Sequence, residues 1–408
     1  MHVFSYFFII IVEKILIMLT QRQLFFQHVA QTSDKPLALE IERAEGIYLY
    51  DSNNKSYIDL ISGISVSNTG HCHPQVVKAI KEQLDKYMHL MVYGEYIQTP
   101  QVKLAAMLAE ILPSSLDCTY FVNSGSEATE GALKLSKRYT GRSEIIAFKN
   151  SYHGSTHGSL SVMGNEHFKQ AFRPLLPDIR LIEYNNPEDL EFISTRTACV
   201  IAETIQGEAG VIVPDQSYMK ALREKCNAEG ALLILDEVQT GLGRTGKMFG
   251  FEHFGIVPDI ITLAKGFGGG MPLGAFISSC EIMQSLTNNP VLGHITTFGG
   301  HPVSCAAAIA NLEVIKNEKL AEQVENKAEL FHKYLNHPSI KSFRGKGLLI
   351  ALQIKDEQTN LEVIDKCIEK GVIIDWFLFA PDCMRIAPPL IISEEEIKAA
   401  CEIILSCL

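Results

Sequence analysis

A lysine at the end of an apolar run is the residue whose position first suggests covalent chemistry. Lys265 follows the apolar segment 259–264 and leads directly into the glycine-rich run 266–270. A lysine that ends a buried strand beside a tight turn loses hydration, which disfavours its ammonium form and lowers its pKa. The neutral amine is a nucleophile that can form a Schiff base with a carbonyl compound. Most lysines at strand ends are simply solvated, so the neighbouring motifs decide between the two interpretations.

A second motif predicts an anion-binding helix terminus. Segment 123–128 reads Asn-Ser-Gly-Ser-Glu-Ala at the point where a strand pattern gives way to a helix pattern. Ser124 and Glu127 have the spacing of a capping box, and Gly125 allows a ligand to approach the backbone closely. The free N–H groups and the dipole of the first helical turn favour an anion such as phosphate. A well-capped helix without a ligand is the alternative interpretation.

A third motif places acids at the end of a buried strand. The apolar run 232–235 is followed by Asp236 and Glu237. At the carboxyl end of a parallel strand, an acid lies at the edge where open α/β sheets bind their ligands. Asp236 can there coordinate Mg²⁺ or pair with a cationic ring nitrogen. The sequence has no G-x-x-x-x-G-K-[ST] motif to support Mg²⁺ coordination. It also has no G-x-G-x-x-G motif after a first strand, so a dinucleotide-binding site is not expected.

The three motifs together match the requirements of one cofactor. Pyridoxal phosphate (PLP) needs a phosphate site, an acid for its pyridinium nitrogen and a lysine for the Schiff base. We therefore expect its phosphate at the helix terminus near Gly125, its ring nitrogen at Asp236 and its reactive carbon at Lys265. The aspartate keeps the ring nitrogen protonated, so the ring can absorb electrons when the substrate loses its Cα proton. The freed lysine can then carry that proton.

These residues require a sheet whose strands end at a common edge. From about residue 100 the chain alternates between short apolar strands and helical patterns, which is typical of a largely parallel sheet covered on both faces. The predicted strands are 119–123, 145–149, 199–203, 231–236 and 260–262, with helices such as 127–139 and 218–228 between them. The C-terminal part of the chain, from about residue 303, predicts a smaller α+β unit. The N-terminal strands are expected to belong to the same unit. Its expected elements are helices 303–318, 321–336 and 394–407 and short strands near 348–354 and 371–374.

Composition limits the classes of function. The 408 residues carry a net charge of -11 at pH 7, which argues against a nucleic-acid partner. The ten cysteines are scattered without a C-x-x-C pair, so we expect reduced thiols in a cytoplasmic protein. Cys72 lies between His71 and His73, but no second cluster with ligand spacing accompanies it, so no metal is predicted.

The N-terminal segment is apolar but predicts neither a membrane span nor a signal peptide. Glu13 and Lys14 interrupt the apolar run 3–19, no lysine or arginine precedes it, and no signal-peptidase site follows. We interpret residues 1–17 as a gene-model extension and expect translation to begin at Met18.

From Met18 onward the chain resembles the class III aminotransferases, the group that holds the ornithine, acetylornithine and 4-aminobutyrate transaminases. The resemblance is carried, in order, by SGISVSNTGHCHP, VNSGSEATEGALKLS, SYHGSTHGSLS, ETIQGEAGV, LLILDEVQTGLGRTGK, DIITLAKGFGGGMPLGA, TTFGGHPVSCAAA, RGKGLL and RIAPPL. It implies an α/β protein of PLP fold type I, similar to aspartate aminotransferase. A large domain with a mostly parallel mixed sheet between helices is expected beside a smaller α+β domain. The expected divisions are an N-terminal segment at 18–65 that is part of the small domain, a large PLP-binding domain at 66–305 and a C-terminal small domain at 306–408.

The resemblance also implies which residues bind the cofactor. Lys265 would hold it as an internal aldimine, and Asp236 would bind the pyridine nitrogen. Gly125 and Ser126, with Thr297 from a second subunit, would bind the phosphate. The residues expected to contact the ring are Tyr152 on one face, Val238 on the other and Gln239 at the phenolic oxygen.

Substrate recognition is expected to depend on an arginine and a glutamate. Arg385 suits a bidentate contact with a substrate carboxylate. Glu208 would pair with Arg385 when the amino donor has no carboxylate there, and would release it for 2-oxoglutarate or glutamate. This switch lets one site accept two dissimilar substrates. Arg385 as part of a structural ion pair is the alternative interpretation.

One departure from the ornithine and acetylornithine branch concerns the donor. Those enzymes resemble FHGRT or FWGRT where this chain has Tyr-His-Gly-Ser-Thr at 152–156. Their arginine helps to hold the donor's α-carboxylate. Ser155 cannot replace it, because a hydroxyl cannot make a bidentate, charge-assisted contact with a carboxylate. The motif looks more like the ω-amine and diaminobutyrate branches and predicts a donor whose reacting amine lies far from any α-carboxylate. Glu203, Tyr93 and Tyr96 each have several interpretations and receive no role.

We therefore predict a cytoplasmic, homodimeric transaminase that moves an amino group from an ω-amino compound to 2-oxoglutarate or pyruvate. Its active site would be shared between subunits, with no nucleic-acid or membrane partner. The alternative is a PLP-dependent aminomutase of the glutamate-1-semialdehyde type, which does not need the switch between Arg385 and Glu208. A non-catalytic regulator is a third class, but residues 1–45 are too short for a DNA-binding module. The sequence does not specify the amino donor.

Overall fold

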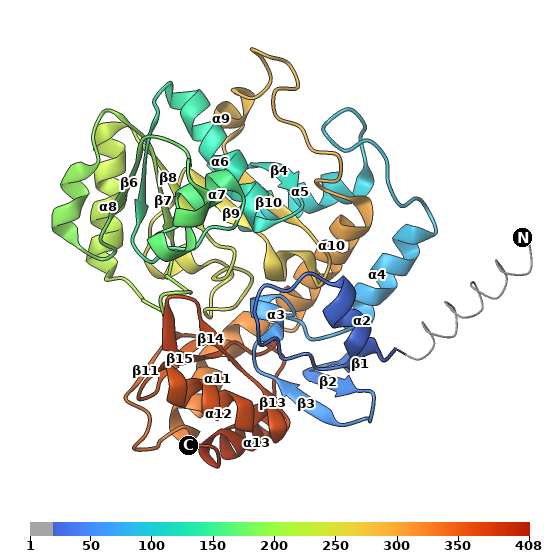
Figure 1. Cartoon of the computed structure of the whole chain (residues 1–408). Helices are drawn as coiled ribbons and strands as arrows, with labels where there is room; N and C mark the ends of the chain where they lie inside the picture. Colours follow the sequence, from blue (N-terminus) through green and yellow to red (C-terminus); the bar gives the residue numbers. More distant parts are fainter. Residues whose placement is uncertain (1–18) are drawn as a thin grey trace, which may run out of the picture.

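The structure, a computed structural model, describes residues 19–408, so the proposed extension 1–17 lies outside the described residues. Its centre is a seven-stranded sheet in the order β4-β10-β9-β8-β7-β5-β6 (Figure 1). Strand β10 is antiparallel to both neighbours, and the other pairs are parallel. The strands are β4 (Cys118–Val122), β5 (Glu144–Phe148), β6 (Ile179–Ile182), β7 (Thr197–Glu203), β8 (Leu232–Asp236), β9 (Ile260–Leu263) and β10 (Gly274–Ser278). This arrangement confirms the predicted α/β class with a mostly parallel mixed sheet.

The sheet is buried on both faces because its inner strands are apolar throughout. Every residue of β7 and β8 is buried. Successive side chains of a strand point to opposite faces, so Ile234 packs in the core beneath helix α6 (Gly125–Thr140) while Leu235 packs in the core beneath α8 (Gln216–Glu229). Helix α6 approaches β10 closely at Gly131, where an added Cβ would lie 2.2 Å from a ring carbon of Phe276.

Strand direction brings six strand ends to one edge of the sheet. β5 to β9 run parallel, and β4 shares their direction because both β4 and β9 are antiparallel to β10. Their carboxyl ends therefore open onto one edge, where ligands bind in open α/β sheets. The chain continues from these ends into the segments that begin at 123, 149, 183, 204, 237 and 264.

Two four-stranded sheets accompany the large one. The first has the order β1-β2-β3-β13, in which the N-terminal β3 pairs in parallel with β13 near the C-terminus (Figure 1). The second has the order β11-β12-β15-β14 and carries Arg385 on β15. Their strands are β1 (Ile41–Glu45), β2 (Tyr48–Asp51), β3 (Ser56–Asp59), β11 (Ser342–Lys346), β12 (Leu349–Gln353), β13 (Val372–Ile373), β14 (Asp375–Phe377) and β15 (Ala380–Ile386).

The remaining long helices connect and cover these sheets. Helix α10 packs on α4 and α5 and contacts the turn after β9, and α11 packs on α13. The helices are α2 (Gln21–His28), α4 (Pro74–Leu84), α5 (Thr99–Ile111), α10 (Pro302–Asn317), α11 (Leu320–Tyr334), α12 (Glu357–Glu369) and α13 (Glu394–Leu405). Within residues 19–408, none of the helices has the length and apolar character that a bilayer crossing requires.

Candidate active site

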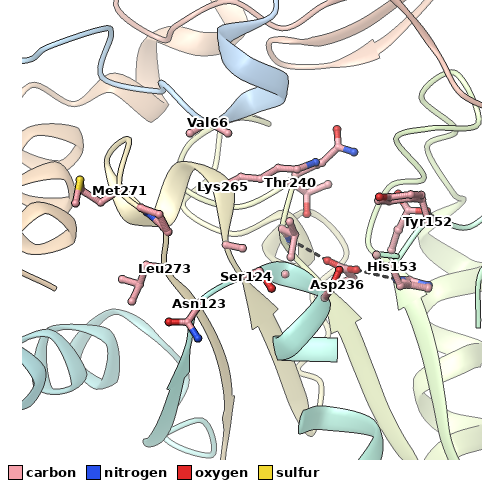
Figure 2. Close-up of a pocket in the computed structure, with 18 of the residues that line it drawn as sticks. Val66, Asn123, Ser124, Tyr152, His153, Asp236, Thr240, Lys265, Met271 and Leu273 are labelled. Carbon is pink, nitrogen blue, oxygen red and sulfur yellow. Dashed lines mark hydrogen bonds and ion pairs between the residues drawn. The ribbon is translucent and has the colours of Figure 1, made fainter. Parts of the chain in front are cut away.

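A cavity of about 420 Å³ lies at the carboxyl edge of the large sheet. Its walls include Lys265 after β9, Asp236 at the end of β8 and Ser124 at the start of α6 (Figure 2). The three motifs that the sequence singled out are therefore brought together around one space. The topology explains this because β4, β8 and β9 end at the same edge.

Lys265 has both the backbone and the electrostatics of a reactive lysine. Its φ angle is +50°, in the left-handed region that a residue with a side chain adopts at a cost of about 1–3 kcal/mol, and such strain is concentrated at functional sites. Desolvation by the surrounding protein lowers the pKa of its amine from the usual 10.5 to about 8, although the charge of Glu208 acts in the opposite direction. At pH 7 roughly a tenth of the amine is therefore neutral and nucleophilic, far more than for a solvated lysine.

Asp236 is held in a fixed orientation by two partners. Its Oδ1 accepts a hydrogen bond from the backbone N–H of Val238 at 3.0 Å, and its Oδ2 lies 2.7 Å from Nδ1 of His153 (Figure 2). The imidazole of His153 is fully buried, so it acts here as a hydrogen-bonding partner of the carboxylate. The carboxylate consequently presents a constant direction to a cation in the cavity.

The start of α6 is capped differently from the sequence prediction. Ser124 Oγ accepts from the N–H of Glu127 at 3.2 Å, as a capping box requires. The carboxylate of Glu127, however, accepts from the backbone N–H and the side-chain amide of Asn123, at 2.7 and 2.8 Å. The capping-box prediction was wrong for this second half because the Asn123 side chain offers the carboxylate an additional donor.

The segment after β5 packs tightly against the first turn of α6. Gly154 has a φ angle of +123°, and a Cβ added there would lie 2.1 Å from Ser126 Oγ, so the close approach requires glycine. The N–H of Ser155 donates to the same oxygen at 3.2 Å. Tyr152 lines the cavity from this segment.

Glu203, at the end of β7, connects two of the segments that form the walls. Its carboxylate accepts from the N–H of Tyr152 at 2.9 Å and from that of Gly207 at 2.8 Å. Burial raises the pKa of Glu203 to about 7, partly opposed by the charge of His153. These contacts favour the interpretation of Glu203 as a hydrogen-bond acceptor that positions its neighbours.

A second cavity, of about 450 Å³, adjoins the first and shares Tyr152 and Lys265 with it. Its walls also include Arg385 and Glu208, which form a bidentate ion pair, with Nη1–Oε1 at 2.9 Å and Nη2–Oε2 at 3.0 Å. Burial favours the protonated form of Glu208, but the charge of Arg385 outweighs it and the pKa of this carboxyl is lowered. Both residues are almost completely buried and ionised.

Gln239 lies between the two cavities. Its Nε2 donates to Glu208 Oε1 at 3.0 Å, and its Oε1 has no partner among the described residues. It also lines the first cavity, so one amide contacts the ion pair while facing the space where a cofactor ring is expected.

Several predicted residues lie outside the two linings. Thr297 is exposed on the loop after α9 (Cys280–Gln284) and lines neither cavity of its own chain. Ser155 is exposed, with its hydroxyl 3.2 Å from the Tyr152 hydroxyl. Tyr93 and Tyr96 do not contribute to either lining, and Tyr96 is 54% exposed.

The sequence prediction missed residues that line the second cavity. Asp375 and Trp376 of β14 and Ile64 of the N-terminal segment face this space. Asp375 Oδ1 lies 3.0 Å from Nε of Arg385, and burial raises the pKa of this carboxyl to about 6, opposed by the Arg385 charge. The available signal was an acid and the only tryptophan of the chain directly after the predicted strand 371–374.

Comparison with protein families identifies the chain. The family model "Aminotransferase class-III" matches residues 29–408. The protein is a class III aminotransferase. The acetylornithine aminotransferase of Archaeoglobus fulgidus is 42% identical over 93% of this chain and 98% of the relative. The [LysW]-aminoadipate semialdehyde/glutamate semialdehyde transaminase of Sulfurisphaera tokodaii is 40% identical over 78% of this chain and 82% of the relative.

Solved structures of this aminotransferase family share the fold. The ornithine aminotransferase of Toxoplasma gondii superimposes with a TM-score of 0.89 at 30% identity, covering 97% of both chains. An (S)-enantioselective ω-transaminase from Thermomicrobium roseum gives a TM-score of 0.88 at 29% identity, with 94% of this chain and 96% of that chain covered. These matches confirm the predicted PLP fold and the transferase class.

The residues around the first cavity fit the cofactor of this family, pyridoxal phosphate. An amine with a lowered pKa, an oriented carboxylate and a helix N-terminus surround one space, which is the donor set that the cofactor requires. The protein is a PLP-dependent transaminase.

Proposed function

We propose that this aminotransferase moves an amino group from an ω-amino compound to 2-oxoglutarate or pyruvate. The observation that carries the proposal is the bidentate pair of Arg385 and Glu208 in a cavity that also reaches Lys265. The relatives named acetylornithine aminotransferase, and the ornithine aminotransferase structure, support a donor with a terminal amine.

The proposed roles of the cofactor-binding residues are those that the family resemblance implies, and the lining of the first cavity by most of these residues supports them. Lys265 would bind the cofactor covalently, and Asp236 would pair with its ring nitrogen. Tyr152 and Val238 would pack on the two ring faces, and Gln239 would approach the ring oxygen. The phosphate would bind at the residues that begin α6, Gly125 and Ser126, and at Thr297 of a second copy of the chain.

The proton transfers can be assigned to residues of this chain. When bound, pyridoxal phosphate supplies an electron-withdrawing ring that stabilises negative charge on the amine-bearing carbon of the substrate. Asp236 stabilises the cationic ring nitrogen that makes this possible, and His153 fixes the direction of its carboxylate. Lys265 Nζ, which borders both cavities, is positioned to take the proton from that carbon and to return it.

Recognition of two substrates would use the same guanidinium. With a donor that has no carboxylate at the far end, Glu208 stays paired with Arg385, as the structure has it. With 2-oxoglutarate, the distal carboxylate of the acceptor would replace Glu208 as the partner of the Arg385 guanidinium. Because Gln239 and the N–H of Leu378 also hold Glu208, at 3.0 and 3.1 Å, its displacement breaks defined hydrogen bonds.

The assembly is proposed to be a homodimer in the cytoplasm. Exposed apolar side chains gather in the two loops 85–98 and 288–298, including Met88, Ile97 and Val291, at 63, 94 and 70% exposure. The exposed Thr297 lies in the second loop. Burial of these loops against another copy would explain both the apolar surface and a contribution of Thr297 to its neighbour's phosphate site.

The test uses enzyme loaded with pyridoxamine 5′-phosphate. Addition of 2-oxoglutarate or pyruvate should return the visible absorption of the aldehyde form and release glutamate or alanine. If neither oxo acid does so, transamination of these acceptors is rejected. An aminomutase of the glutamate-1-semialdehyde type, which the Arg385–Glu208 pair does not favour, would instead convert its substrate without any added oxo acid.

A further inference from the structure

Apart from Lys265, the charged residues of the second cavity carry more negative than positive charge. Its charged wall residues are Arg385, Glu208 and Asp375, together with Lys265 at the boundary with the cofactor cavity. Lys265 is committed to the cofactor under the proposed function. The remaining residues provide one cation and two carboxylates, so the space between them has a net charge of about −1 at a pH where all three are ionised.

Both terminal nitrogens of Arg385 are already engaged. Nη1 and Nη2 contact Glu208, and Nη2 also donates to the backbone oxygen of Trp376 at 2.8 Å. The remaining donor, Nε, lies 3.0 Å from Oδ1 of Asp375. Among residues 19–408, neither of these two atoms has a hydrogen-bond partner with good geometry. Asp375 is therefore close to a cation but incompletely paired.

Asp375 is also accessible to a ligand. Its side chain retains 18% of its accessible surface and forms part of the cavity wall. The pKa of about 6 means that the carboxyl is mostly ionised at the slightly alkaline pH of a usual assay. A partly desolvated carboxylate without a full set of donors binds a cation more strongly than a surface carboxylate does.

Within the part of the chain that the structure describes, no second arginine lines this cavity to balance the charge. The segment 152–156 has Ser155 in place of an arginine, and its hydroxyl contacts Tyr152. A donor that carries a distal carboxylate must displace Glu208 and then lies beside Asp375. A donor that carries a distal cation can instead pair with the carboxylate of Asp375, and the Arg385–Glu208 pair then stays intact.

We propose that Asp375 selects amino donors that carry a second cationic group, so that the preferred donor class is a diamine or a related diamino compound rather than a monoamine or an ω-amino acid. This inference rests on the proposed transaminase function and names its donor class. It predicts that the reacting amine enters towards Lys265 while the distal ammonium pairs with the Asp375 carboxylate.

The test compares three donors that have the same four-carbon chain. 1,4-Diaminobutane carries a distal cation, butylamine a distal methyl group and 4-aminobutyrate a distal carboxylate. Each is mixed with the PLP-loaded enzyme in a single turnover without oxo acid, and the loss of the aldehyde-form absorption gives the rate constant divided by the dissociation constant. We expect the diamine to exceed butylamine by about tenfold or more, because a charge-assisted hydrogen bond contributes that much, and to exceed 4-aminobutyrate as well.

Variants assign the preference to Asp375. Asp375→Asn should reduce the advantage of the diamine over butylamine to about threefold or less, whereas Asp375→Glu should retain most of it. Asp382→Asn is the matched control, because Asp382 lies on the adjacent β15 and accepts from Gln353 at 2.8 Å outside the cavity. Circular dichroism and cofactor content establish that each variant is folded and loaded.

The outcomes are distinguishable. If butylamine or 4-aminobutyrate is the fastest wild-type donor, or if Asp375→Asn keeps the diamine preference, the inference is overturned while transamination stands. If no primary amine converts the cofactor and oxo acids also fail on the pyridoxamine form, the proposed function itself fails.

Discussion

Replacement of Arg385 by lysine separates recognition of the acceptor from chemistry at the cofactor. Alanine is the poorer choice, because it would leave Glu208 and Asp375 buried beside no cation, and breaking a buried pair in this way costs about 3–5 kcal/mol of stability. Lysine keeps the positive charge but cannot form the two-point contact that now joins Nη1 and Nη2 to a carboxylate at 2.9 and 3.0 Å.

The expected magnitude follows from the loss of one charged hydrogen bond. Such a bond contributes about 1.5–3 kcal/mol, so kcat/KM for 2-oxoglutarate should fall roughly 10- to 100-fold. The half-reaction with butylamine should change by less than about threefold, because this donor has no carboxylate for Arg385 to bind.

Stopped-flow measurement of the two half-reactions gives both quantities separately. Arg223→Lys is a suitable control, since Arg223 of α8 pairs at 2.7 Å with Asp259, directly before β9, and lines neither cavity. An equal loss in both half-reactions of Arg385→Lys would refute the reasoning, because it would make Arg385 a structural residue.

Three further perturbations test the cofactor site. Because the pKa of Lys265 is about 8, cofactor uptake by apoenzyme should accelerate about tenfold per pH unit below pH 8 and level off above it, and a flat profile would contradict this. Gly154→Ala should weaken cofactor affinity by about tenfold or more, because the added methyl group clashes with Ser126. Gly141→Ala is the control: this glycine also has a positive φ but open space around it, so the variant should lose only about 1 kcal/mol of folding stability. Asp236→Asn should lower the single-turnover rate by about a hundredfold or more while the enzyme still binds cofactor; an unchanged rate would exclude its role at the ring nitrogen.

The apolar strands of the large sheet were predictable because their buried residues form continuous runs. The expected strand 231–236 corresponds to β8 (Leu232–Asp236), and 260–262 to β9 (Ile260–Leu263). Lys265 and Asp236 could be placed at one edge because parallel strands share their direction. Strand β10 was missed because it follows a glycine-rich turn and runs antiparallel, which no sequence periodicity indicates.

The second cavity was harder to predict because its walls come from distant parts of the chain. Arg385 and Glu208 were recognised from the family motifs, yet the contact of Asp375 with Arg385 depends on the register of β14 with β15, where these residues are directly paired. Glu127 shows the same limitation on a smaller scale, since the choice between capping Ser124 and binding Asn123 depends on side-chain rotamers.

The most direct test of the account is to locate the cofactor on the chain. Borohydride reduction of the PLP-loaded enzyme, followed by proteolysis and mass spectrometry, should place the modification on Lys265. Lys169 is an internal control, because burial also lowers its pKa but its amine donates to the backbone oxygens of Ser161 and Met163, at 3.2 and 3.0 Å, and lines neither cavity. Modification of Lys265 alone is the predicted result; an unmodified Lys265, or an equal modification of Lys169, would contradict the central claim.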